Sequence, residues 1–219
     1  MSSGNSLLTV AIIAMLVSAV SLGFTYFTIS NVKSGVLTGY ATANANATIN
    51  ITIASNIAIN FTTNNINFGS GSLNPGTVYA VLDTAAGTVV NGTWTPTSTK
   101  LVLENIGTAN VTLNLMTNKN ASSLINGTNS YYQYNVTISD SAAACVNMTG
   151  GGAGTVMTSG FTLGSAWYNV NNSALGTIVC DKFGFLDAAD AIKIDFRLGI
   201  PYDSNNGTLG DIVTATATG

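Results

Sequence analysis

The chain lacks histidine, and it contains few charged residues, prolines and cysteines. Its 219 residues include no His, 3 Pro and 2 Cys, and only 7% are Asp, Glu, Lys or Arg. Without His, the most common general base and transition-metal ligand is missing, so a Ser-His-Asp or Cys-His catalytic site is excluded within the chain. The 6 basic residues and the net charge of −3 give no electrostatic footprint for nucleic acid. We therefore expect no enzymatic activity, no cofactor or metal site and no nucleic-acid partner.

The shortage of charge means that uncharged polar groups must keep the chain soluble. Soluble domains contain about 25% charged residues, whereas Asn, Thr and Ser are the abundant polar residues here. Eleven Asn-x-Ser/Thr triplets are potential N-glycosylation sites, and their asparagines are Asn46, Asn50, Asn60, Asn91, Asn110, Asn120, Asn126, Asn135, Asn147, Asn171 and Asn206. The alternative is that these triplets arise by chance, because the chain is rich in Asn and Thr. Glycans at these sites would place the domain outside the cytoplasm and would replace the missing surface charge.

An uncharged apolar run, Leu7 to Ile29, lies near the N-terminus. As a helix it would be roughly 34 Å long, enough to cross a hydrocarbon core of about 30 Å. Small and hydroxyl side chains recur along it at spacings of three and four residues, at Ala11, Ala14, Ser18, Ser21, Thr25 and Thr28. This seam would let helix backbones approach closely, so we expect these six residues to pack against other helices. Thr9, Ala19 and Gly23 are small but lie off the seam, so a plain anchor or signal segment is the alternative.

The residues on either side of the apolar run help to distinguish a packing helix from a signal segment or a plain anchor. A secretory signal peptide begins with a basic region, but no basic residue precedes Leu7. Val17-Ser18-Ala19 would serve as a cleavage site, yet the apolar run continues beyond it. In a conventional anchor, Lys33 would hold the remainder of the chain in the cytoplasm, which conflicts with the glycosylation sites. We therefore expect Met1 to lie close to a processed N-terminus, with a basic leader already removed.

Apolar residues alternate with polar ones after the linker, which is typical of half-buried strands. The pattern predicts a long strand over Ile49–Phe61, with apolar residues on one face. Further strands are predicted at Asn65–Phe68, Thr77–Leu82, Lys100–Glu104, Asn110–Met116, Tyr131–Ile138, Thr177–Cys180, Ala191–Leu198 and Asp211–Thr216. A helix from Ser6 to about Gly39 and a linker make up residues 1–44. The remainder, 45–219, is predicted to be a mainly β domain, an antiparallel β-sandwich or jelly roll.

The two cysteines, Cys145 and Cys180, agree with an exported domain. In an oxidising compartment they would form one disulfide, which closes a loop of about 35 residues. Two buried free thiols are the alternative.

Acidic and aromatic residues offer two weaker candidates for binding. Six of the nine acids lie near the C-terminus, where Lys193 and Arg197 are interleaved as ion-pair partners, so we expect a structural role. The alternative is a structural Ca²⁺ bound by Asp181, Asp187 and Asp190, or by Asp203, Asn205 and Asp211. Core packing is expected for the aromatic residues, and a sugar-binding platform is the alternative for Trp94, Trp167, Tyr131, Tyr132 and Tyr134.

An uncharged apolar helix, a short linker and an Asn/Thr-rich β domain together resemble archaeal type IV-like pilins and archaellins. The seam from Ala11 to Thr28 matches the helix core of such filaments. The resemblance implies an extracellular filament at the cell surface, with bundled helices inside and glycosylated β domains outside. Its partners would be copies of the same chain, the membrane before assembly, and surface or glycan targets.

A second resemblance covers less of the chain. The hairpin Lys100–Met116 and the stretch 200–214 are similar to secreted archaeal and bacterial surface sandwiches, including biofilm-matrix fibre subunits. Two alternatives to the helix-cored filament therefore remain. One is a membrane-tethered adhesin or surface-layer component, and the other is a fibre in which Ile49–Phe61 is donated to the sheet of a neighbour.

Overall fold

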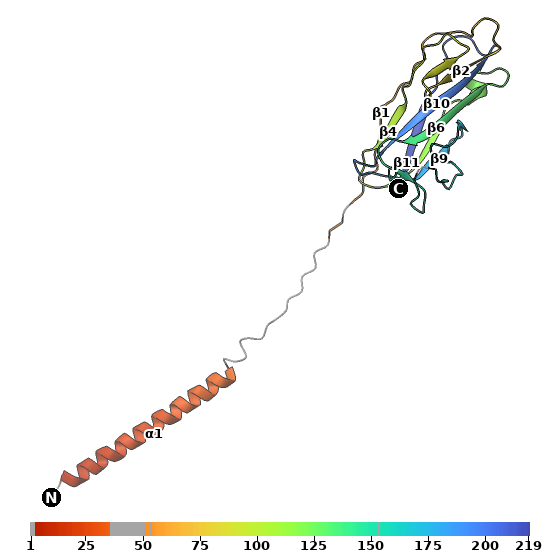
Figure 1. Ribbon diagram of the computed structural model, residues 1–219. Helices are drawn as coiled ribbons and strands as arrows, with labels where there is room; N and C mark the ends of the chain where they lie inside the picture. Colours follow the sequence, from red (N-terminus) through yellow and green to blue (C-terminus); the bar gives the residue numbers. More distant parts are fainter. Residues whose placement is uncertain (1–2, 36–50, 53, 153) are drawn as a thin grey trace. The chain divides into compact units, whose positions relative to one another are not determined.

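The computed structural model describes residues 3–35, 51–52, 54–152 and 154–219 (Figure 1). It forms two compact units, Met1–Thr52 and Ile53–Gly219. The sequence predicted a boundary after residue 44, within a stretch that lies outside the described residues. The chain is mainly β, with antiparallel sheets and one apolar N-terminal helix, so the predicted fold class is confirmed.

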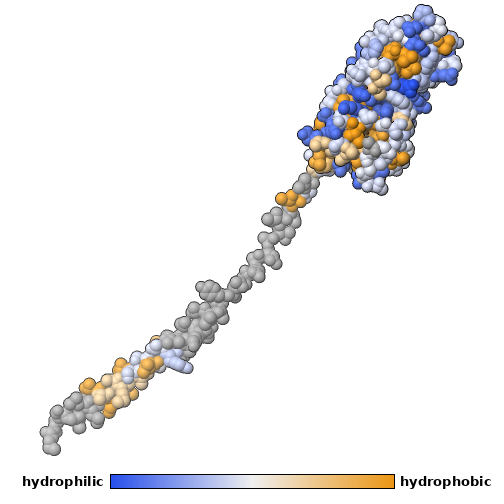
Figure 2. All heavy atoms as spheres, in the orientation of Figure 1, coloured by the Kyte–Doolittle hydropathy of each residue, from blue (hydrophilic) through white to orange (hydrophobic). Residues whose placement is uncertain are grey.

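The first unit contains one helix, α1 (Ser3–Gly35), against a predicted span of Ser6 to about Gly39. The stretch Thr9–Tyr26 is 18 residues long and apolar enough to cross a membrane, by length and composition. All side chains of this stretch are exposed. Figure 2 colours it orange to pale, without the deep blue of charged residues. Because apolar residues occur on every side of the helix, no polar face is available for water.

The second unit is a head domain built from two antiparallel sheets (Figure 1). The larger sheet contains β1 (Ile59–Thr63), β2 (Tyr79–Asp83), β3 (Thr88–Val90), β4 (Leu101–Asn105), β6 (Tyr131–Ile138), β8 (Tyr168–Asn169) and β10 (Ala191–Pro201). The smaller sheet has the order β11 (Val213–Thr218), β5 (Val111–Thr117), β9 (Thr177–Phe183) and β7 (Cys145–Val146). A short helix, α2 (Ala121–Leu124), follows β5.

Side chains that alternate along the strands form the core between the sheets. In β4 and β5, every second residue is buried, as the alternation predicted. The centre of the core is fully buried and comes from both sheets, at Leu103, Leu113, Val136, Val179, Phe183, Ile192 and Ile194. Burying each such side chain stabilises the fold by about 1.5–3 kcal/mol relative to exposure.

Strand β10 is the longest strand and organises the larger sheet. One of its edges pairs with β6 over Ile192–Gly199. Its other edge pairs with β4 over residues 191–194 and then with β2 over residues 197–201. Thus β2 and β4 follow each other along one edge, although residues 84–100 separate them in the sequence.

The buried Asp195 carboxylate holds this junction together. Asp195 is 1% exposed, and its two oxygens each lie 2.9 Å from Lys100 Nζ. The Thr84 hydroxyl donates to Asp195 at 2.9 Å and accepts from the backbone N–H of Phe196 at 2.9 Å. Lys193 and Arg197 were expected to pair with the C-terminal acids, but among the described residues Lys100 pairs with Asp195, and Arg197 Nε lies 3.9 Å from Asp83, which is not one of those acids.

Most strands lie where the sequence predicted them, within about two residues, but two predictions were wrong. The stretch Asn65–Phe68 is not a strand; the Asn67 side chain instead accepts from Gly69 N at 2.8 Å in a turn with Gly69 at φ 68°. The long strand Ile49–Phe61 is also shorter, because β1 begins at Ile59 and the described residues before it are not in a strand. The sequence missed β3, β7, β8 and α2, which have four residues or fewer.

Replacing Lys100 with Met should destabilise the head, because it leaves a buried carboxylate without its counter-charge. We expect a loss of about 3 kcal/mol in the free energy of unfolding. Urea titration followed by tryptophan fluorescence measures it, since Trp94 and Trp167 both lie in the head. The control is Lys182→Met, which removes an exposed lysine from β9. Equal effects of the two substitutions would contradict the role assigned to Asp195.

Candidate functional site

The seam forms one side of the exposed helix. Ala11, Ala14, Ser18, Ser21 and Thr25 fall within an arc of about 80° at 3.6 residues per turn, and all are exposed. The side chain of Thr28 lies outside the described residues. Two shallow hollows on the helix surface contain seam residues, and larger apolar side chains border them: Val10, Ile13, Leu16, Val17, Val20 and Phe24. The seam is thus a row of notches into which side chains of another helix can fit.

The hydroxyl groups of the seam are directed to the helix's own backbone. Ser18 donates to Met15 O at 2.8 Å, Ser21 donates to Ser18 O at 2.9 Å, and Thr25 donates to Ser21 O at 2.7 Å. Because these donors are satisfied within α1, they can enter an apolar environment without the penalty of an unmade hydrogen bond. The seam therefore offers small size rather than polar bonds to a partner helix.

The potential glycosylation sites of the head differ in how far their asparagine side chains are exposed. Five asparagines have exposed side chains: Asn60, Asn91, Asn110, Asn126 and Asn206. Asn91 and Asn126 occupy left-handed turn positions, with φ of 59° and 60°, each directly before a glycine. Asn46 and Asn50 lie outside the described residues. An enzyme can reach the exposed amides without unfolding a strand.

Two asparagines, Asn135 in β6 and Asn171 in the loop between β8 and β9, are half-buried and packed against neighbouring residues. Asn171 donates its amide N–H to Gly176 O at 2.9 Å and to the Thr177 hydroxyl at 3.2 Å. Asn135 lies in the middle of β6, opposite Asp195 of β10, and its Oδ1 atom is buried with no hydrogen-bond partner among the described residues. A glycan on either amide nitrogen would compete with these packed surroundings.

The remaining two asparagines, Asn120 and Asn147, are half-buried and use their side-chain oxygens locally. Asn120 Oδ1 accepts from Ser123 N at 2.9 Å and caps the first turn of α2. Asn147 Oδ1 accepts from the backbone N–H groups of Thr149 and Gly151 at 3.1 and 2.9 Å. These bonds leave the oxygen in a structural role in both residues.

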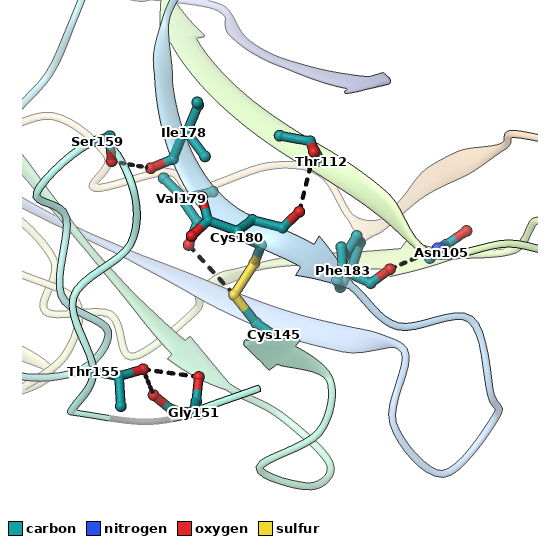
Figure 3. The surroundings of a disulfide bond; sticks show 12 residues. Asn105, Thr112, Cys145, Gly151, Thr155, Ser159, Ile178, Val179, Cys180 and Phe183 are labelled. Carbon is teal, nitrogen blue, oxygen red and sulfur yellow. Dashed lines mark hydrogen bonds between the residues drawn. A yellow bond between two sulfur atoms is a disulfide. The ribbon is translucent and has the colours of Figure 1, made fainter. Parts of the chain in front are cut away.

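The structure joins Cys145 of β7 to Cys180 of β9 in a disulfide (Figure 3). Both residues are fully buried, and their Cα atoms lie 5.3 Å apart. Next to it, the buried Asp181 carboxylate accepts from Met148 N at 3.3 Å and Thr158 N at 3.0 Å. The disulfide and Asp181 together hold the loop that follows β7 against the smaller sheet.

Two of the acidic residues considered for calcium, Asp181 and Asp203, accept hydrogen bonds from the protein instead. Asp203 accepts from the backbone N–H and the hydroxyl of Thr128 at 2.9 and 2.8 Å, and these bonds lower the pKa of Asp203. Burial and the nearby carboxylates of Asp140, Glu104 and Asp187 raise the pKa of Asp190. Among the described residues, no group of three or more Asp, Glu, Cys or His side chains is placed to hold a metal ion.

The aromatic residues considered for sugar binding do not form one platform. Tyr132 and Tyr134 are buried in the core, and Trp94 packs against its edge. Tyr131 and Trp167 lie outside the core, where the Arg197 guanidinium is 5.4 Å from the first ring and 5.9 Å from the second. The five side chains therefore divide between the core and the outer face of the larger sheet.

A groove at one edge of the sandwich is a surface feature that sequence reasoning missed. It lies between β1 with the residues after it and β11 with the residues before it, and it has a volume of about 380 Å³. We call it the edge groove. Core residues of the larger sheet line it, at Phe61, Leu101, Tyr132, Phe196 and Leu198, and the facing wall is residues 209–213. A second hollow of about 820 Å³ shares residues Ile66, Phe68, Leu124, Leu198 and Leu209 with it.

An acidic side chain lies in the wall of the edge groove. Both carboxylate oxygens of Asp211 are buried, and the Tyr132 hydroxyl lies beside them in the same groove. Burial, the negative charge of Asp211 and the side-chain interaction with it raise the pKa of Tyr132. No sequence signal marked this site, because its walls are formed by segments more than a hundred residues apart in the chain.

Glycopeptide mass spectrometry of the native protein should separate the exposed asparagines from the packed ones. We expect glycans at Asn60, Asn91, Asn110, Asn126 and Asn206, because their amides are exposed. We expect Asn135 and Asn171 to be unmodified, because the side-chain oxygen of Asn135 is buried and the Asn171 amide nitrogen donates to Gly176 O. Full occupancy at these two residues with empty exposed sites would contradict the assignment.

Replacing Cys145 and Cys180 together with Ala should destabilise the head but leave its sheets intact. A disulfide that closes a loop of about 35 residues stabilises a fold by about 4 kcal/mol in the loop-entropy model. Urea titration of the variant and of the parent under oxidising conditions measures the difference. Adding a reductant to the parent should reproduce the loss, whereas the variant should not respond to it.

Comparisons with known proteins identify no relative of this chain. No protein-family model, no curated protein and no solved structure matches the chain. The function is therefore argued from the helix surface, the exposed asparagines, the disulfide and the edge groove.

Proposed function

We propose that this protein is the structural subunit of an extracellular pilus-like filament. In this filament the N-terminal helices bundle in the core, and the β domains form a glycosylated sheath around them. Copies of the same chain are the main partner, and the membrane holds the helix before assembly. The architecture, an apolar N-terminal helix followed by a β-rich domain, is compatible with archaeal type IV-like pilins and archaellins.

The observation that carries this proposal is the fully exposed apolar surface of α1. Ten of its large side chains between Val10 and Tyr26 are more than half exposed, including Met15 at 73% and Phe24 at 72%. Such a surface must be covered by lipid or by other helices, because exposed apolar area is unfavourable in water. The seam favours other helices, since its notches allow close contact and its hydroxyls are already satisfied.

The properties of the head support a place outside the cell. A disulfide forms and persists in oxidising compartments, and the head contains one between Cys145 and Cys180. Five exposed asparagines in acceptor triplets supply attachment points for glycans on a surface that has little charge. With no His in the chain and no assembled metal-ligand cluster among the described residues, a structural function fits better than catalysis.

A membrane-tethered adhesin or surface-layer protein is the second candidate. The 18-residue stretch Thr9–Tyr26 favours it, because its length and composition suit a single membrane span. This candidate needs no specific helix face, since lipid surrounds a lone helix uniformly. The two functions therefore differ in how they respond to bulky side chains on the seam.

Substituting Leu for Ala14 and Ser18 should abolish filaments, because the added side chains fill the notches where helices meet. The matched control is Ala19→Leu with Gly23→Leu, which adds bulk at the same spacing but off the seam. Negative-stain imaging of cell-surface material, with immunoblotting for surface display, gives the readout. We expect loss of filaments for the seam pair alone. Normal filaments in the seam pair would contradict the proposal, and display without filaments in the wild type would favour the tether.

A further inference from the structure

We infer that a glycan attached to Asn206 lies in the hollow of about 820 Å³ beside the edge groove and covers the core of its own head there. We call this depression the core hollow. The inference rests on the proposed function in one respect, because it requires that the head is glycosylated. It gives one glycan a defined seat on the protein, whereas the proposed sheath requires only that glycans surround the filament.

The floor of the core hollow is an opening into the hydrophobic core. Four buried core residues line it, at Leu82, Leu124, Ile125 and Ile200. Partly buried side chains that pack against the core, such as Phe68 and Trp94, extend this apolar lining. Contact between this surface and water is unfavourable, so an occupant that covers it stabilises the head.

The rim of the core hollow is polar but uncharged. Among the described residues that line the hollow there is no Asp, Glu, Lys or Arg. The side chains of Ser70 and Thr208 are exposed at the hollow, and that of Tyr202 is 72% exposed. A saccharide presents matching surfaces, because its C–H groups pack on apolar and aromatic side chains and its hydroxyls bond to uncharged polar groups. The volume also suits such a ligand, since sites for small molecules measure about 300–1,000 Å³.

The attachment point identifies the occupant as a glycan of the same head. Of the acceptor asparagines that the structure describes, Asn206 alone lines the core hollow, and Gly207 and Thr208 of its triplet line it as well. A sugar on the Asn206 amide nitrogen therefore begins at the rim of the hollow. Because this sugar is tethered, its effective concentration at the floor exceeds that of a free saccharide or lipid.

Backbone hydrogen bonds hold the walls of the core hollow in place. Directly before Asn206, the N–H of Asn205 donates to Ile125 O at 2.8 Å. Another part of the wall is held by the N–H of Thr95, which donates to Phe68 O at 3.0 Å. The attachment point and the apolar lining therefore keep their places in the head, and a glycan meets a preformed surface.

Limited periodate oxidation of the full glycosylated chain tests the inference, because periodate cleaves the vicinal diols of sugars whatever their identity. The chain is purified as single molecules in a detergent without a sugar headgroup, and glycopeptide mass spectrometry follows the sugars nearest to each asparagine. The reference is the glycan on Asn110, which is exposed and does not line the hollow. We expect oxidation at Asn206 to be roughly tenfold slower than at Asn110 in the folded head, because its diols are covered, and equal after unfolding in urea.

Substitution of Tyr202 tests whether the glycan lies against the lining of the core hollow. Tyr202→Ala removes a ring on which a sugar can pack, so oxidation at Asn206 should accelerate toward the rate at Asn110. Tyr202→Phe keeps the ring and should keep the slow rate. Because Tyr202 is mostly exposed, neither substitution should unfold the head. Equal rates at Asn206 in the two variants would overturn the inference.

Removal of the glycan provides a second readout that does not depend on oxidation. Asn206→Gln keeps an amide but accepts no N-glycan, so it leaves the floor of the core hollow open to water. We expect its urea midpoint, followed by tryptophan fluorescence, to lie about 0.5 M below that of the parent. Asn110→Gln removes an exposed glycan elsewhere and should keep the parent midpoint. Equal midpoints of the two variants would contradict a glycan seated on the core.

Two further results would overturn the inference, namely an unmodified Asn206 and equal oxidation at Asn206 and Asn110 in the folded head. Either result would leave the core hollow to a free saccharide, a lipid or a second copy of the chain. Imaging of cell-surface material reports on the proposed function separately. Filaments with an unprotected Asn206 glycan would remove only the seat, whereas a protected glycan without filaments would keep the seat and remove the filament.

Discussion

The head depends on one buried charge, the Asp195 carboxylate at the middle of β10. Through Lys100 and Thr84 it joins the end of β2 to the start of β4, so that two strands share one edge of the longest strand. A charge at this depth is tolerated because both oxygens have donors. In return, the chain between β2 and β4 can form β3 on the far side of β2 and then return to β10 without breaking the edge along which the larger sheet is built.

Apolar surface is distributed unevenly in the molecule. The interface of the two sheets is closed by alternating side chains, whereas the helix and the edge groove leave apolar side chains exposed. In a chain with 7% charged residues, these exposed surfaces have few charges around them to keep molecules apart.

The parts of the fold that could be predicted are those governed by short-range periodicity. Strands β4, β5 and β6 were evident because one face is buried and alternate residues are therefore apolar. The pairing of Lys100 with Asp195 could not be predicted, because the two residues are 95 positions apart and no local pattern links them. Asn65–Phe68 has the period of a strand, but the turn at Gly69 ends the pattern before any pairing. The functions of the seam and of the exposed asparagines stay predictions, since they depend on partners and enzymes outside the chain.

The hydrogen bonds of Asn171 relate glycosylation to the order of folding. In the folded head the Asn171 amide nitrogen donates to Gly176 O and to the Thr177 hydroxyl, so an enzyme must break these bonds to reach it. A glycan at Asn171 is therefore easier to attach before these bonds have formed. The ratio of modification at Asn171 to that at the exposed Asn206 thus measures how far export and modification precede folding.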